Sequence, residues 1–92
     1  MTDLQQLAVK IITEQELVIG PLAWSEAGKV QGLQISSNHD VSILNGDPKI
    51  AVDRLVAQYE RLFGRASHEV CREAAASLIA GMPITEVPSS LR

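Results

Sequence analysis

Residues 47–80 constrain the fold most strongly, because they predict two consecutive helices separated by a single glycine. Over 48–63 the large apolar side chains other than Ile50 fall on one half of the helix circumference and most charged side chains lie opposite, as in an amphipathic helix. Asp47 is a favourable N-cap, and Pro48 suits the first helical position because proline has no N–H to leave unpaired. We expect Gly64 to end this helix in a left-handed conformation, since glycine has no Cβ to clash when φ is positive.

A second helix is predicted over 67–80, with Ser67 as its cap and with Gly81 and Pro83 ending it. Its apolar side chains spread over about 180° of the helical wheel, whereas a stripe of about 100° is enough to cover one core. The alanines at 74–76 would let another backbone approach closely. We therefore expect this helix either to be central in the fold or to pack against a second copy of the chain.

Two further helices are predicted near the N-terminus, over 2–18 and 21–27. The longer one carries apolar residues at helical spacing, but Gln15 falls inside the apolar arc, which predicts fraying or a bend in its last turn. Gly20 is expected to cap the shorter helix, with Pro21 at its first position.

A β-hairpin is predicted where the apolar period changes to two, with 30–36 pairing with 41–44. The intervening polar residues are typical of a turn, and Gly32 is expected to weaken the first strand or mark a bulge. Because an isolated two-stranded hairpin is marginal in water, we expect this one to lie on the helices or to pair with a second chain.

These elements together predict a helix-dominated α+β fold, in the order helix, short helix, β-hairpin and two antiparallel helices. A chain of 92 residues is expected to form one domain, with a compact unit over 1–83 and an irregular, frayed tail over 84–92. The chain begins with Met1, and we expect a complete small protein. Its hydrophobic content of 46% predicts a mainly aliphatic core, because aromatic residues are scarce.

Charge and composition argue against several classes of function. The net charge is −3 and the charges are interspersed, so no stripe of Lys and Arg is available to follow nucleic-acid phosphates. No apolar run is long enough to span a membrane, and the first residues do not form a signal peptide. A single cysteine cannot form an internal disulfide, which favours a reducing cytoplasm. We expect neither nucleic-acid nor membrane binding.

Four residues could supply metal ligands: His39, Asp40, His68 and Cys71. His68 and Cys71 are three residues apart on one helix and hence share a face, and a structural zinc site needs four ligands. The alternative that we favour makes Cys71 a small, buried and unreactive side chain and His68 a residue at the edge of the apolar arc. A catalytic thiol would need exposure and a cationic setting, so we expect no catalytic residue, no metal and no cofactor.

Four residues are candidates for an interface: Trp24, Ile50, Ala75 and Ile79. Trp24 is either an anchor of the core or its rim, or a hot spot of the kind enriched at interfaces. Ile50 projects onto the polar side of its helix, and the other two lie on the wide apolar arc of the last helix. We expect a homodimer through this last helix or through the hairpin edge, and the competing interpretation is a monomer.

The sequence favours a small non-catalytic interaction or regulatory module, acting as a homodimer or on a larger protein partner. The alternative is a domain that senses a small molecule or a metal, with its site between hairpin and helices. An enzyme is the least favoured class. The Gly-Pro and Gly-Arg helix breaks are similar to a pattern recurrent in bacterial proteins, without indicating a family or an activity.

Overall fold

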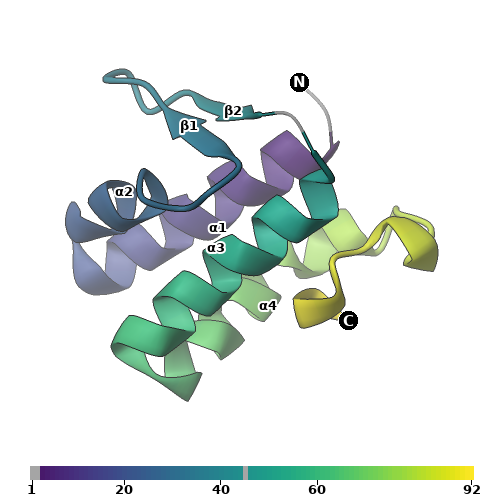
Figure 1. Ribbon diagram of the computed structural model, residues 1–92. Coiled ribbons are helices and arrows are strands. Elements are labelled where there is room, and N and C mark those ends of the chain that lie inside the picture. The colour runs from purple at the N-terminus through teal and green to yellow at the C-terminus, as the bar shows by residue number, and fades with distance from the viewer. Residues whose placement is uncertain (1–2, 45) are drawn as a thin grey trace.

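The computed structural model describes residues 3–44 and 46–92 (Figure 1). In chain order its elements are the helices α1 (Asp3–Ile19) and α2 (Leu22–Ala27), the strands β1 (Leu33–Ile35) and β2 (Val41–Ile43), the helices α3 (Pro48–Phe63) and α4 (Arg65–Ile79), and the single-turn 3-10 helices η1 (Ile84–Glu86) and η2 (Ser89–Leu91). The predicted helix-dominated α+β fold is confirmed, including the order of its main elements.

The core lies between α1, α3 and α4, which pack against one another. In Figure 1 the hairpin lies above α1 and α3, and it contacts α1 and α2. The larger side chains that are fully buried are mostly aliphatic, with one tyrosine: Leu7, Ile11, Ile12, Val52, Leu55, Val56 and Tyr59. The expected aliphatic core is therefore present, and α4 packs one face on α1 and α3 of its own chain.

The hairpin is shorter than the sequence predicts, with three residues in each antiparallel strand. Leu33 pairs with Ile43 and Ile35 with Val41, so these four side chains share the face toward the core, where Leu33 and Val41 are buried and the other two partly buried. The chain before β1 forms turns instead of extending the strand. Gly32 lies in this region with φ +98°, and a Cβ added there would lie 3.2 Å from the Cβ of Ala51.

Both ends of α3 lie where the sequence predicts them, but the conformation of Gly64 differs from the prediction. The Asp47 carboxylate accepts a hydrogen bond from the backbone N–H of Lys49 at 2.9 Å, and Pro48 is the first helical residue. Gly64 ends the helix with φ +90° and donates its N–H to the carbonyl of Glu60 at 2.8 Å. Its ψ of −174° is extended instead of left-handed helical, so the chain reverses at this one residue and α4 follows at once.

Three local predictions are wrong. α1 continues through Gln15 to Ile19, because the Gln15 side chain finds buried hydrogen-bond partners. Gly20 ends α1 with φ +75°, and Pro21 is the N-cap of α2. Ser67 does not cap α4, which begins two residues earlier.

The prediction that the C-terminal tail frays is also wrong. Residues 84–92, which we call the C-terminal strap, form η1 and η2, and η2 packs on α3 and α4. Pro83 and Pro88 precede these single-turn helices instead of marking irregular chain. Val87 and Leu91 join the hydrophobic core of the rest of the molecule, and their burial holds the strap in place.

Candidate functional site

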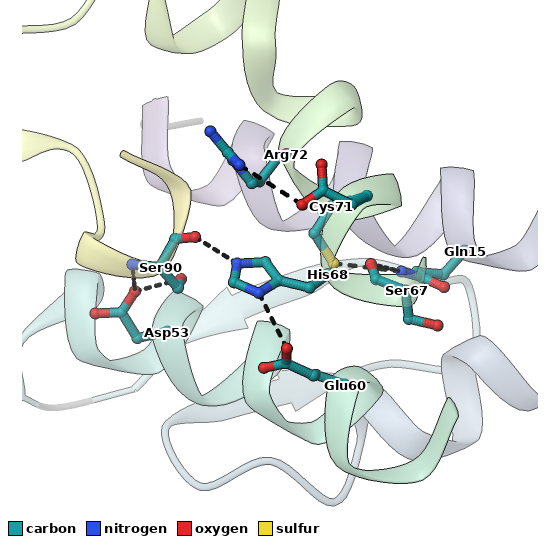
Figure 2. A network of polar contacts seen from close by, with 9 residues as sticks. Gln15, Asp53, Glu60, Ser67, His68, Cys71, Arg72 and Ser90 are labelled. Carbon is teal, nitrogen blue, oxygen red and sulfur yellow. Dashed lines mark hydrogen bonds and ion pairs between the residues drawn. The ribbon is translucent and has the colours of Figure 1, made fainter. Parts of the chain in front are cut away.

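The most connected polar cluster lies where α3, α4 and the C-terminal strap meet (Figure 2). It includes Asp53 and Glu60 from α3, His68 from α4 and Ser90 from the strap. Asp53 and Glu60 are seven residues apart and hence on similar faces of α3. In Figure 2 the Asp53 carboxylate points toward Ser90 of the strap, and the Glu60 carboxylate points toward the His68 ring.

The His68 imidazole lies between two hydrogen-bond acceptors. Its Nε2 is 2.7 Å from the Ser90 carbonyl oxygen, and its Nδ1 is 3.2 Å from a Glu60 carboxylate oxygen. A neutral imidazole has one N–H, whereas the imidazolium has two and can donate to both acceptors. The Ser90 carbonyl raises the pKa of His68 most, and Glu60 raises it further, against the opposing effect of burial.

The Asp53 carboxylate holds the other side of Ser90. It accepts hydrogen bonds from the Ser90 backbone N–H at 3.0 Å and from the Ser90 hydroxyl at 2.6 Å. Its second oxygen accepts a bond from the Ser89 hydroxyl at 3.0 Å. Asp53 thus acts on η2 much as an N-cap residue acts on a longer helix, by accepting from its first donors.

A second, buried polar group ties α1 to α4. The Gln15 amide donates from Nε2 to the Ser67 carbonyl at 2.8 Å and lies 3.3 Å from the Cys71 sulfur. Burial raises the pKa of the Cys71 thiol to about 11. The prediction that Cys71 is buried is confirmed, and its low reactivity stays a prediction.

The metal site considered from the sequence is not assembled. His39, at the hairpin turn, stacks on the Trp24 ring with 4.1 Å between ring centroids and 8° between planes. His68 faces Glu60 and the strap, and Cys71 lies against Gln15. Within 3–44 and 46–92, no three His, Cys, Asp or Glu side chains gather as a metal site. The turn folds onto α2, so His39 and Asp40 do not join a cluster with His68 and Cys71.

The structure distributes the four candidate interface residues differently. Ala75 is fully buried in the chain's own core and has no surface to offer a partner. Trp24 and Ile79 are half-buried against the core, and Ile50 is exposed. The expectation that small residues on α4 serve a dimer therefore fails at Ala75, because α4 uses that face to pack within the chain.

The most exposed aliphatic side chains of the α1–α2 corner were not among these candidates. Leu17, Val18 and Leu22 are 78%, 63% and 45% exposed, and we call them the aliphatic corner. A signal was present in the sequence, because residues 17–25 contain no charged side chain. An amphipathic wheel alone misplaces Val18, since it assigns this residue to the buried arc of α1.

A shallow groove with a basic lining runs between α3 and the loop that follows α2. It has a volume of about 270 Å³, and Lys29, Arg54 and Arg61 line it together with Gln31 and Gln58. Arg54 and Arg61 are two helical turns apart on α3. Lys29 comes from the opposite side and pairs with Glu26 at 3.0 Å.

Comparison of the chain with protein-family models, curated proteins and solved structures gives no match. In the described part of the chain, no helix combines the length and apolar character needed to cross a membrane. Function is therefore inferred from the side chains and their contacts.

Proposed function

We propose that the protein is a small non-catalytic interaction module that associates with a second copy of itself through the aliphatic corner. The observation that carries this proposal is the exposure of Leu17, Val18 and Leu22 within six consecutive residues. Covering a group of large aliphatic side chains with a partner removes apolar surface from water, which is favourable, and such exposed patches mark interaction sites.

The absence of charge in residues 17–25 supports a second copy as the partner. In a two-fold dimer the same patch faces itself, so a charged patch would bring like charges together. An uncharged aliphatic patch meets its own copy without that cost. Trp24 lies in the same segment and is half-buried, which suits an anchor at the rim of such an interface.

The state of the reactive side chains supports a non-catalytic role. Both ring nitrogens of His68 are engaged by Glu60 and the strap. Burial raises the pKa of the Cys71 thiol to about 11, so the nucleophilic thiolate is scarce at neutral pH. These groups hold the fold together and have little capacity left for chemistry.

Sedimentation velocity across micromolar concentrations tests the proposal. The wild type is expected to form a dimer, and Leu17→Glu should shift it toward the monomer because it places a charge in the interface. Ile84→Glu is the matched control, since Ile84 is 64% exposed but lies on η1. A wild type that stays monomeric throughout, or equal dissociation by both variants, would reject the proposal.

A second candidate function is the binding of a small phosphate-bearing anion in the basic groove. Its specific support is that, among the residues that the structure describes, three cationic side chains and no carboxylate line one groove of a chain with net charge −3. Glu26 pairs with Lys29, and the Glu26 side chain is itself largely buried. The hydrogen bond from Lys29 lowers the pKa of Glu26. Within residues 3–44 and 46–92, Arg54 makes one long hydrogen bond, to the Gln31 carbonyl at 3.4 Å, so its guanidinium can turn to an anion.

Titration with pyrophosphate, followed by amide chemical shifts, tests this second candidate. Shifts should concentrate on residues 29–31 and the middle of α3, and Arg54→Gln should remove them. Arg65→Gln is the control, because Arg65 is exposed at the start of α4 and does not line the groove. Equal shifts in both variants would mean that the groove has no anion site.

A further inference from the structure

The C-terminal strap is held to the helices by two kinds of contact. Val87 and Leu91 are buried in the core, and this part of its attachment does not depend on pH. Ser90 is held by polar contacts on both sides, with its N–H and hydroxyl on Asp53 and its carbonyl on His68. The polar contact to His68 involves a side chain that titrates near neutral pH.

The geometry around His68 favours one protonation state. Both of its ring nitrogens face oxygen atoms that can only accept hydrogen bonds, one on Glu60 and one on Ser90. In either neutral tautomer, one ring nitrogen carries no hydrogen, and its lone pair faces the lone pairs of an acceptor oxygen, which is unfavourable. The charged ring has no such conflict, and its bonds are charge-assisted.

The other charged groups around His68 do not reverse this preference. On α4, Glu69 adds to the raised pKa of His68 and is itself paired with Arg72 at 3.6 Å. Asp53 on α3 accepts its bonds from the strap. Arg92 on the strap donates to the Val87 carbonyl. The charges that act on the ring are therefore mainly carboxylates.

We propose that the C-terminal strap is fastened to α3 and α4 by a proton on His68, and that loss of this proton raises the fraction of molecules in which the strap is open. Deprotonation leaves a single neutral N–H for two acceptors. Glu60 can then turn to solvent, because its side chain is 43% exposed, and the remaining bond to Ser90 is no longer charge-assisted. Opening uncovers the apolar surface of α3 and α4 beneath Val87 and Leu91.

Amide hydrogen exchange tests the proposal on the wild-type protein. The Ser90 N–H, which donates to Asp53, reports strap opening, and the ring resonances of His68 report its titration. The protection of the Ser90 amide is expected to be high on the acid side, to fall as His68 loses its proton and to level off afterwards. The Leu44 N–H, bonded to the Gly32 carbonyl at the open end of the hairpin, is the internal control and should keep its protection.

Three variants separate the proton from other effects. His68→Gln keeps a donor toward Ser90 but does not titrate, so the protection of Ser90 should become independent of pH. His68→Phe has no donor, so protection should be low at every pH. Glu69→Gln removes the minor carboxylate and should keep the wild-type shape of the curve.

Two results would overturn the proposal. One is a Ser90 amide whose protection stays constant while His68 titrates in the wild type. The other is a fall of protection in His68→Gln equal to that of the wild type. If His68→Gln or His68→Phe prevents folding, the pH titration of Ser90 protection in the wild type still tests the proposal, because it needs no variant.

Discussion

Asp53 and Ser90, 37 residues apart in the chain, are joined by two hydrogen bonds to the same carboxylate oxygen. The Ser90 hydroxyl donates at 2.6 Å and its backbone N–H at 3.0 Å. One side chain in the middle of α3 therefore positions the end of the chain, and His68 completes the attachment from α4.

We predict that Asp53→Ala lowers the free energy of unfolding by ~2 kcal/mol, because it removes a charged acceptor from three donors. Asp53→Asn should cost less, since its amide oxygen can still accept two of these bonds. Urea denaturation measures both. A value for Asp53→Ala within error of the wild type would show that the Asp53 carboxylate does not contribute to holding the strap.

Gly64→Val should lower the free energy of unfolding by about 1–2 kcal/mol. The cause is the backbone, because φ is +90° and nothing lies within 4 Å of an added Cβ. Gly28→Ala is the matched control, since Gly28 has a helical backbone and an added Cβ would make only ordinary contacts. Equal melting temperatures for Gly64→Val and the wild type would contradict this account.

Cys71 is expected to react with a thiol reagent only after unfolding. Its side chain is fully buried, and burial raises the pKa of the thiol to about 11. A Ser77→Cys variant supplies the positive control, because position 77 is exposed on the same helix. Rapid stoichiometric labelling of the native wild type would reopen a metal-binding or catalytic role for this cysteine.

The stability of the fold should decline as the pH rises through the folded-state pKa of His68. The hydrogen bonds to the Ser90 carbonyl and to Glu60 raise the pKa of His68 in the folded protein above the ordinary value for histidine, so the folded state binds the proton more tightly than the unfolded state. The stabilisation that the His68 proton provides is fully present below the pKa of His68 in the unfolded chain. It is lost as the pH rises above the pKa of His68 in the folded protein. Comparing urea midpoints of the wild type and His68→Gln across this window isolates it. Parallel curves would mean that His68 does not contribute to the pH dependence.

The beginning and end of α3 could be predicted from sequence because the interactions that set them are local. Asp47 accepts from Lys49 two residues away, and Gly64 needs only its own lack of a Cβ to adopt a positive φ. The burial of Cys71 was predictable for a related reason, since a regular helix fixes which residues share a face. The true bounds of α4 differ by two residues at its start, within the usual uncertainty of helix ends.

The candidate site was decided by tertiary structure alone. His68 and Cys71 were considered from sequence as possible metal ligands, although no metal was expected, and their partners Ser90 and Gln15 lie 22 and 56 residues away. Helical periodicity gives the direction of a side chain but not what covers it. Ala75, assigned to a partner, is therefore covered by its own chain, while Val18, assigned to the core, remains in solvent. The strap shows the same limit, because nine residues carry no periodicity and only the surfaces of α3 and α4 give Val87 and Leu91 a place to bury.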